Sequence, residues 1–351
     1  LDRIIRDYRN GQENGCPEII AVPTPSYSGS HTEGYWAATK AIVAHYARPS
    51  EPNRRINVVV PHISPADIRE IQRIFTLMGL EITLIPDYSL TLDRPFAGRY
   101  QKIPAGGTKP EEIAAMPGAP LTIQFGATCP DNLSPGLWLE QEYGVPLVTL
   151  PLPVGIEAAD QLLAFLEKVS GHSRPETLLN ERGWLLDAMA DAHKHNAEGR
   201  AVIYGEPELV YSLVRACTEN GIAPVVIATG TRTSRLAACL EPLLAGLDEQ
   251  PVVLEETDFA AIGAAALRAG ANIAIGHSGG KFFTERHGIP VVRTGFPVHD
   301  RLGGQRILSA GYAGTLALLD RITNTLLEEK HGSYRRLRYE ETNRTEIMEG
   351  T

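Results

Sequence analysis

The sequence contains few cysteines: four among 351 residues, at positions 16, 129, 217 and 239. No two of them form a Cys-x-x-Cys pair, so their spacing predicts neither a zinc knuckle nor a disulfide framework. Such sparse use of cysteine in a large acidic chain fits a reducing compartment, and no charged and then apolar leader marks the chain for export. We therefore expect a cytoplasmic protein.

Long apolar runs and an excess of positive charge are also missing. No run reaches the roughly 18 apolar residues that a membrane helix needs. The richest stretch, residues 145–166, is interrupted by three prolines and two carboxylates. The 33 Lys and Arg residues face 42 Asp and Glu residues, which gives a net charge of −9 without a basic stripe. We therefore expect neither a membrane nor a nucleic acid as a partner.

The sequence has no initiator methionine. Leu1 opens directly into a segment with apolar residues at positions 1, 4, 5 and 8, the spacing of an amphipathic helix. We interpret this segment as part of a first domain that is incomplete in this chain. At about 150 residues per domain, the length predicts two to three domains.

Short apolar runs rich in β-branched residues alternate along the chain with helical periods. The runs are continuous, which is typical of strands buried on both faces of a parallel sheet. We expect strands over residues 55–61, 81–86, 121–126, 145–150, 200–205, 223–228, 251–254, 271–276 and 290–293. The pattern predicts an α/β fold.

Two strand–helix–strand units, residues 55–86 and 200–228, share one plan. In each, a helix begins at a proline, Pro65 or Pro207, and ends at a glycine before the second strand. Ser64 is placed to cap the first of these helices. The repeated plan predicts tandem Rossmann-like domains with parallel sheets, the first domain being incomplete.

We divide the chain accordingly. Residues 1–50 are the remainder of an N-terminal Rossmann-like domain, and residues 51–172 are a second such domain. Residues 173–332 hold a linking helix and a third Rossmann-like domain, and residues 333–351 are a polar tail that we expect to be mobile. Helices are expected over residues 156–195, interrupted at 171–175, and over residues 314–330.

The first candidate site is the segment 23–31 (PTPSYSGSH), which follows an apolar run at 19–22 that we interpret as a strand. Its hydroxyls, including Ser26, and the imidazole of His31 could contact an anionic ligand or a metal cluster. The same residues would also form an ordinary capped loop between a strand and a helix. Taken alone, the segment favours the capped loop.

The second candidate is the segment 276–281 (GHSGGK), a G-x-S-x-G pattern between a predicted strand and helix, as in a hydrolase nucleophile elbow. Asp300 and His331 follow Ser278 in the chain order of a hydrolase triad. The pattern is short, however, and His331 falls close to the polar tail. We favour a glycine-rich turn without a reacting serine.

The third candidate is the segment 293–304 (RTGFPVHDRLGG). An arginine, a histidine and an aspartate gather there around glycine turns. These residues either form a polar functional cluster or provide an Arg–Asp pair that braces a loop, and they suggest no reaction by themselves.

Taken in order, these segments resemble the component 1 family of nitrogenase. The likeness covers about residues 17–330 and is carried by residues 24–31 (TPSYSGSH), 181–193 (ERGWLLDAMADAH), 275–282 (IGHSGGKF), 293–304 (RTGFPVHDRLGG) and 311–312 (GY). The resemblance implies Rossmann-like domains around metal clusters and a β-type subunit.

Within the family, two further segments resemble the NifN-type subunit of the cofactor-assembly scaffold. They are residues 85–93 (IPDYSLTLD), with the later Gly106-Gly107-Thr108, and residues 300–328. The second contains Leu302-Gly303-Gly304 where the catalytic subunit typically carries a histidine-rich segment. The segment 24–31, in contrast, is closer to the catalytic β subunit, and Ser26 falls where that subunit has a serine able to ligate the oxidised P-cluster.

The resemblance implies a scaffold subunit on which the iron–molybdenum cofactor is matured by insertion of molybdenum and homocitrate. The implied partners are a NifE-type subunit in a heterotetramer and the nitrogenase iron protein. The implied cofactors are an iron–sulfur cluster and a cofactor precursor at the subunit interface, beside Ser26 and His31. Their ligands are expected before Leu1 or in the partner.

Several points stay open at this stage. Cys129 is the best-placed thiol, and we favour a structural role for it; we expect no catalytic residue and identify no metal ligand. The alternative function is that of a catalytic β subunit of a nitrogenase or nitrogenase-like reductase. The sequence does not decide between a molybdenum, vanadium or iron-only system.

Overall fold

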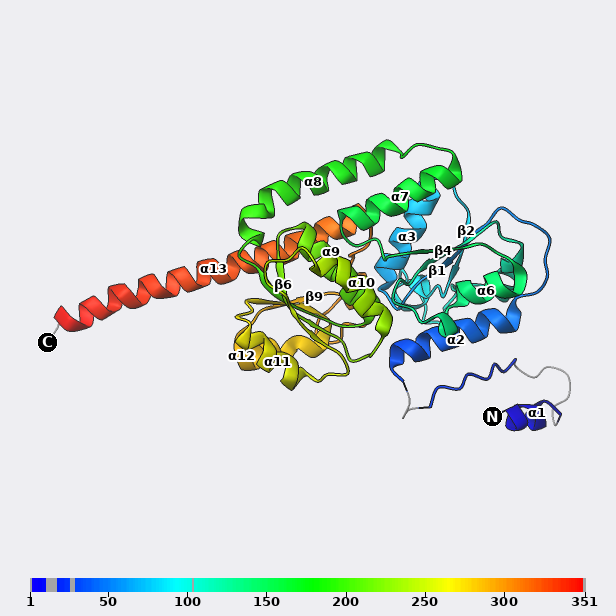
Figure 1. The fold of residues 1–351 in the computed structure, drawn as a ribbon, viewed down its shortest axis with the longest axis horizontal. Coiled ribbons are helices and arrows are strands. Elements are labelled where there is room, and N and C mark those ends of the chain that lie inside the picture. Colours follow the sequence, from blue (N-terminus) through cyan, green and yellow to red (C-terminus); the bar gives the residue numbers. More distant parts are fainter. Residues whose placement is uncertain (1, 11–17, 26–28, 103, 350–351) are drawn as a thin grey trace.

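The computed structural model describes residues 2–10, 18–25, 29–102 and 104–349. Within these ranges nine of the ten predicted strands are present, and they form two parallel sheets that lie side by side (Figure 1). The first sheet has the order β2-β1-β3-β4, with β1(Ile56–Val59), β2(Ile82–Ile85), β3(Thr122–Phe125) and β4(Leu147–Leu150). The second has the order β7-β6-β5-β8-β9, with β5(Arg200–Tyr204), β6(Ala223–Ala228), β7(Val252–Leu254), β8(Ile273–Gly276) and β9(Val291–Arg293).

Strand β1 has apolar residues on both faces because both faces of the strand are buried. Successive side chains of a strand point to opposite faces of the sheet. Val58 belongs to a core with α3(Pro65–Leu77) and α7(Ile156–Ser170), whereas Val59 belongs to a core with α2(His31–Tyr46) and α6(Pro135–Tyr143). Both side chains are fully buried, which explains the continuous apolar run.

The second sheet is built in the same way. Ile203 of β5 packs in the same core as Val58, together with α9(Pro207–Glu219). Its neighbours Val202 and Tyr204 point to the other face, toward α11(Phe259–Arg268) and α12(Lys281–His287). A single apolar core therefore lies between the two sheets and joins them.

The remaining elements are short, except for two long helices. The short ones are α1(Asp2–Asn10), α4(Ser89–Leu92), α5(Pro110–Ala114), α10(Ser234–Leu244), η1(Met116–Gly118), η2(Asp131–Leu133), η3(Ser278–Gly280) and η4(Gly304–Arg306). The long ones are α8(Glu176–Asn196) and α13(Gly311–Glu349), which pack against each other.

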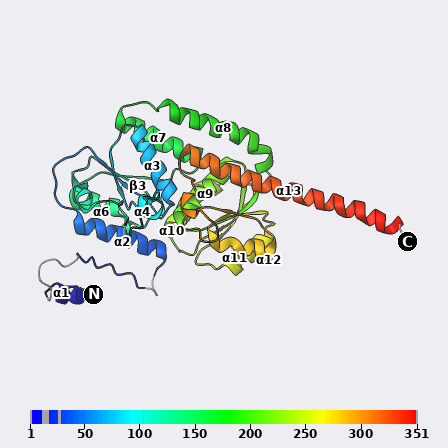
Figure 2. The same cartoon turned by 180° about the vertical axis from the view of Figure 1, so that it is seen from behind.

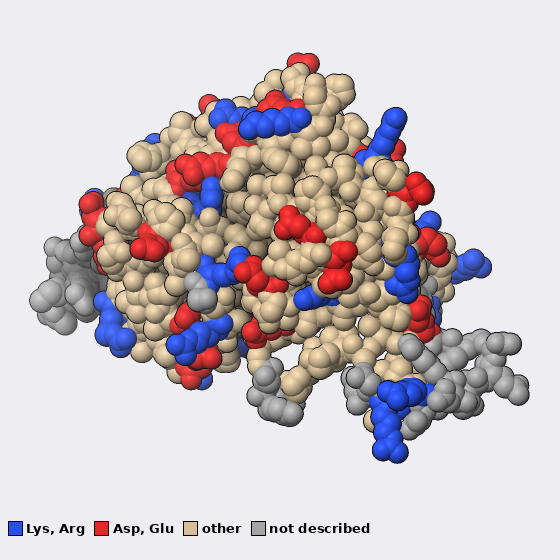
Figure 3. Space-filling model, turned by 45° about the vertical axis from the view of Figure 1, so that its right-hand side comes forward, with Lys and Arg blue, Asp and Glu red and all other residues tan. Residues whose placement is uncertain are grey.

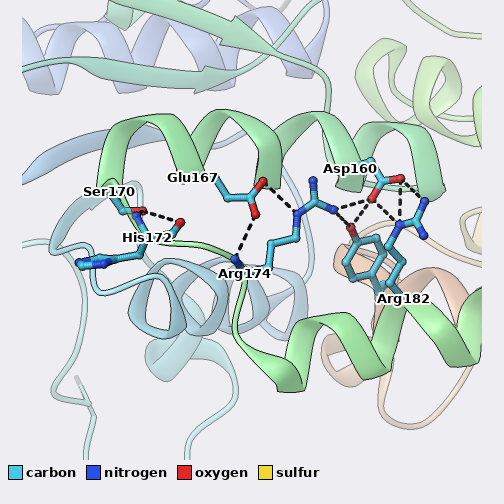
Figure 4. Close-up of polar contacts among 7 residues, drawn as sticks. Asp160, Glu167, Ser170, His172, Arg174 and Arg182 are labelled. Carbon is cyan, nitrogen blue, oxygen red and sulfur yellow. Dashed lines mark hydrogen bonds and ion pairs between the residues drawn. The ribbon is translucent and has the colours of Figure 1, made fainter.

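Asp160 joins the three helices α7, α8 and α13. Its carboxylate accepts hydrogen bonds from Arg182 on α8, from Arg174 in the break between α7 and α8, and from the hydroxyl of Tyr312 on α13 (Figure 4). Burial alone would raise the pKa of Asp160, but the hydrogen bonds from Arg182 and Tyr312 outweigh burial and lower it. The predicted interruption of the long helical stretch at residues 171–175 is confirmed.

Two expectations about local structure are wrong. Residues 19–22 are not a strand, because no ladder partner pairs with them among the described residues. The last helix is longer than the expected 314–330. It continues to Glu349, so residues 333–349 are helical, and this end projects away from the body (Figures 1 and 2).

The charges on the described surface are mixed. On the face shown in Figure 3, acidic and basic side chains alternate without a broad field of either sign. Among the described helices, none combines the length and the apolar character needed to cross a bilayer.

Candidate functional site at the switch points of the two sheets

Each sheet has one point where the order of its strands reverses direction. In the first sheet it lies between β1 and β3, and in the second between β5 and β8. Open α/β sheets bind ligands in the crevice outside the carboxyl ends of such strands. His62 follows β1, Glu206 follows β5 and His277 follows β8, so the fold brings these three residues to the switch points.

Glu206 makes the central polar contact of the site. One carboxylate oxygen, Oε1, lies 2.6 Å from Nε2 of His31, the first residue of α2. The other oxygen, Oε2, is buried and has no hydrogen-bond partner among the described residues. The hydrogen bond that His31 donates to Glu206 raises the pKa of His31, although partial burial of the ring opposes the shift. The pair therefore joins the imidazole ring of His31 on α2 to a carboxylate at the start of α9.

The N-terminus of α2 holds His31 in place. Ser30 accepts a hydrogen bond from the backbone N–H of Glu33 at 3.3 Å, and the Glu33 carboxylate accepts one from the N–H of Ser30 at 2.7 Å. This reciprocal arrangement is a capping box. The capped loop expected for the segment 23–31 is confirmed at its described end, and the cap also presents His31 to Glu206.

His62 lies in an aromatic surround. Its ring centroid is 5.3 Å from that of Tyr35, 5.4 Å from that of Phe296 and 6.2 Å from that of Tyr88. Burial lowers the pKa of His62, and the positive charge of His31 lowers it further. His62 is therefore a neutral imidazole at neutral pH.

His277 lies on the other side of the switch point of the second sheet, after β8. Its Nδ1 accepts a hydrogen bond from the N–H of Gly279 at 3.1 Å, and its ring packs 5.3 Å from that of Tyr204. Burial lowers its pKa as well. The site thus combines the ion-paired ring of His31, two neutral imidazoles and a carboxylate oxygen with no partner among the described residues, a set able to bind a polar group or to exchange a proton.

Two buried carboxylates fix the switch points relative to each other. Glu208 of α9 accepts hydrogen bonds from the N–H and hydroxyl of Thr128, both at 2.9 Å, and from the N–H of Leu152 at 3.3 Å. Asp67 of α3 accepts bonds from the N–H groups of Ser309 and Ala310 at 2.7 and 2.8 Å. Each helix therefore contacts loops of the other sheet through its buried carboxylate. Burial raises the pKa of both Asp67 and Glu208.

Ser278 does not form a hydrolase triad. Its Oγ accepts a hydrogen bond from the backbone N–H of His299 at 2.6 Å. No hydrogen bond or ion pair joins Ser278 to His331 among the described residues; His331 is an exposed residue of α13. The interpretation of a glycine-rich turn is therefore the better one.

The Arg–Asp brace predicted in the third segment is present. Arg293 binds both carboxylate oxygens of Asp300, with contacts of 2.7 to 3.0 Å, and both side chains are largely buried. The hydrogen bonds from Arg293 lower the pKa of Asp300. This pair holds the loop after β9, which also carries Phe296 beside His62.

The structure describes the position of one of the two residues predicted to bind a cofactor. His31 lies at the switch points, whereas Ser26 falls outside the described residues. Sequence reasoning missed His62 and Glu206. The signal for both was their position directly after a buried apolar run, in the segments VVVPH and VIYGE.

Comparison with known proteins shows the family. The model of the nitrogenase component 1 type oxidoreductases matches residues 1–327. The β chain of the nitrogenase molybdenum-iron protein from Clostridium pasteurianum is 32% identical over 314 residues, covering 89% of this chain and 68% of that one. The β chain of the nitrogenase vanadium-iron protein from Trichormus variabilis is 32% identical, covering 94% of this chain and 73% of that one.

A solved structure supports the same assignment. A chain of the structure titled "Nitrogenase Cp1 at pH 6.5" superposes with a TM-score of 0.88 at 32% identity, covering 94% of this chain and 72% of that chain. The α/β fold with parallel sheets that the resemblance implied is therefore confirmed.

The described residues do not fit a metal cluster. Iron–sulfur clusters are held by cysteine thiolates. Burial raises the pKa of Cys129 and of Cys217, the latter to about 12, and Cys239 is also shifted upward by burial. No group of three or more His, Cys, Asp or Glu residues within the described ranges is arranged to hold a metal ion. Burial therefore keeps the described cysteines in the protonated thiol form at neutral pH.

Proposed function

The chain belongs to the nitrogenase component 1 type oxidoreductases, and from this premise we propose that it is the β-type subunit of a scaffold for maturation of the nitrogenase iron–molybdenum cofactor. In this role it binds partners and presents a surface to the precursor, without turnover of its own. The proposal places it in the cytoplasm, in a heterotetramer with a NifE-type subunit that is served by the nitrogenase iron protein.

One observation carries the choice of a scaffold over a catalytic subunit. It is the turn Leu302-Gly303-Gly304, where the resemblance expects a histidine-rich segment in a catalytic subunit. Gly303 has a φ of 79°, which glycine adopts without strain. A Cβ on Gly304 would lie 2.5 Å from the carbonyl oxygen of Val298. The conformation of the loop therefore requires glycine at positions 303 and 304. The side chain of Leu302 is fully exposed.

The switch-point site supports a binding role for this chain. Under the proposal, His31 and Ser26 lie at the surface that faces the precursor. His31 has the exposure for this, since 70% of its side chain is accessible while Glu206 holds the ring. The ligands of the cluster itself belong to the parts of the assembly outside the described residues.

The alternative function is that of a catalytic β subunit. It is favoured by the segment TPSYSGSH and by the similarity to β chains of both molybdenum-iron and vanadium-iron nitrogenases. Because proteins of both metal types match at 32% identity, the similarity does not select a metal.

The test is anaerobic purification of the complete gene product with its co-expressed partner, followed by metal analysis and two activity assays. The scaffold predicts iron in the complex and transfer of a matured cofactor to apo-nitrogenase. Molybdenum or vanadium cofactor together with reduction of nitrogen or acetylene would overturn it. A preparation from cells lacking this chain is the control.

A further inference from the structure

The loop between α4 and α5 carries the most exposed aromatic side chains of the described chain. Phe96 and Tyr100 are each 89% exposed, and Leu90 and Leu92 are 44% and 51% exposed. Scattered exposed apolar residues are common on protein surfaces, but here two almost fully exposed aromatic rings line the same hollow. The hollow has a volume of about 400 Å³ and is also lined by Arg94 and Arg99.

The same loop is basic in an acidic protein. Arg94, Arg99 and Lys102 lie in the stretch 94–110, which contains no acidic residue, whereas the whole chain carries a net charge of −9. None of the three forms an ion pair with any residue that the structure describes, and Arg94 donates a hydrogen bond only to Gln101, at 2.6 Å. Their charges are therefore available to a partner.

The loop is anchored at its start. Asp93, with 13% of its side chain exposed, binds Arg69 of α3 at 2.7 Å and Arg306 of η4 at 3.1 Å. Arg69 also donates to the backbone oxygens of Ser89 and Asp93. Because α3 packs on the first sheet and η4 follows the last strand of the second, elements of both sheets hold the start of the loop at Asp93. Such anchoring lowers the entropy cost of binding.

We propose that the aromatic-basic loop, residues 90–102, is a docking site for a second protein with an acidic surface. Aromatic side chains and arginine are the residue types enriched where protein interfaces bind tightly, and the positive charge selects a negative partner. The proposal holds for a scaffold subunit and for a catalytic subunit alike.

The first test measures binding of poly-L-glutamate to the complete gene product in complex with its partner subunit, at low and at high salt. The variant R94E/R99E/K102E is expected to bind about tenfold more weakly at low salt, because attraction becomes repulsion. The matched control K194E/R232E/R268E reverses three cations outside the loop and is expected to bind like the wild type. Equal loss in both variants, or tighter binding of single-stranded DNA or phosphatidylserine vesicles, overturns the proposal.

The second test places a photo-cross-linking amino acid at position 96 of the complete chain in living cells. Mass spectrometry then identifies the cross-linked peptides. The proposal is supported by cross-links to an acidic segment of a further protein. These cross-links should be lost when the same chain also carries R94E/R99E/K102E. Cross-links within the same chain, to the partner subunit of the heterotetramer, or to no protein contradict it. Circular dichroism of each variant checks that the fold is retained.

Discussion

Helices α3 and α9 occupy corresponding places in the two sheets, but the residue before each helix is used differently. Each helix begins at a proline, Pro65 or Pro207, directly after the first strand of its sheet. Ser64 caps α3 by accepting a hydrogen bond from the N–H of Asp67 at 3.0 Å. Glu206, within the described chain, makes no such bond in α9 and pairs with His31 instead.

At this position the first sheet provides a helix cap, whereas the second provides a carboxylate that pairs with His31. Both helices carry a buried carboxylate, Asp67 or Glu208, that binds backbone N–H groups of the other sheet. The first sheet therefore uses both polar positions for the fold. The second uses Glu208 for the fold, while Glu206 pairs with His31 and keeps one buried oxygen without a partner among the described residues.

The largest expected effect is the loss of either buried carboxylate. Glu208→Ala and Asp67→Ala should each lower the free energy of unfolding by about 3 kcal/mol, because buried N–H donors lose a charged acceptor. Urea unfolding followed by circular dichroism measures the change. The exposed Glu241→Ala is the control and should change stability by less than about 0.5 kcal/mol. Equal effects of all three variants would show that the carboxylates do not lock the sheets together.

The next effect concerns Glu219, at the C-terminal end of α9. Its carboxylate accepts hydrogen bonds from the N–H groups of Ile156 and Glu157 at 2.7 and 3.3 Å, and burial raises its pKa to about 7. Between the unfolded value near 4.5 and about 7, the native state holds the proton more tightly than the unfolded state does. The free energy of unfolding should therefore fall with rising pH across this window, by on the order of 2 kcal/mol.

The variant Glu219→Gln should remove that slope. Urea midpoints measured in a pH series check it, and Glu241→Gln, which changes an exposed carboxylate, should keep the wild-type slope. The nearby charges of Glu157 and Arg215 act in opposite directions on Glu219 and are present in all three proteins. An unchanged slope in Glu219→Gln would assign the pH dependence to another group.

A smaller effect separates the two caps. Ser64→Ala should lower the free energy of unfolding by about 1 to 2 kcal/mol, because α3 loses its cap and Ile307 loses a hydrogen-bond donor at its carbonyl oxygen. Glu206→Ala should change stability by less than about 0.5 kcal/mol, since this residue does not cap α9. Chemical denaturation of both variants gives the comparison, and a larger loss for Glu206→Ala would reverse it.

The smallest effect is on the charge of His31. Glu206 raises the pKa of His31 above 6.5, so the stabilisation from this pair is fully present below pH 6.5 and is lost as the pH rises through the higher folded value. In Glu206→Gln the pKa should move down toward 6.5, as measured by NMR titration of the ring. Glu33→Gln, which alters the capping box without removing the contact to the ring, should leave the titration unchanged.

The sequence allowed most of the fold to be predicted because its signals are local. Continuous apolar runs identified every strand of the two sheets, and Pro65 and Pro207 identified the starts of equivalent helices. The failures occurred where local signals do not decide. Residues 19–22 are apolar but have no strand beside them among the described residues, and the polar residues after 333 continue a helix that is nucleated earlier in α13.

The site was predicted only in part. His31 was singled out from its own segment, but its partner Glu206 is 175 positions away and looked like an ordinary residue before a proline. The G-x-S-x-G pattern showed the opposite error: a motif drew attention to Ser278, whose hydroxyl is occupied by the N–H of His299.

By itself, the sequence determined the class of fold, the family and the elements of each sheet. Hydrophobic periodicity and the residues that begin or end a helix are signals that act over a few positions. Only the tertiary structure decided which polar side chains meet. The contacts of Glu206 with His31, Glu208 with Thr128 and Asp67 with Ser309 each join segments that are far apart in the sequence. Such pairs depend on how the two sheets dock, and docking is set by the shape of the shared core rather than by any local pattern.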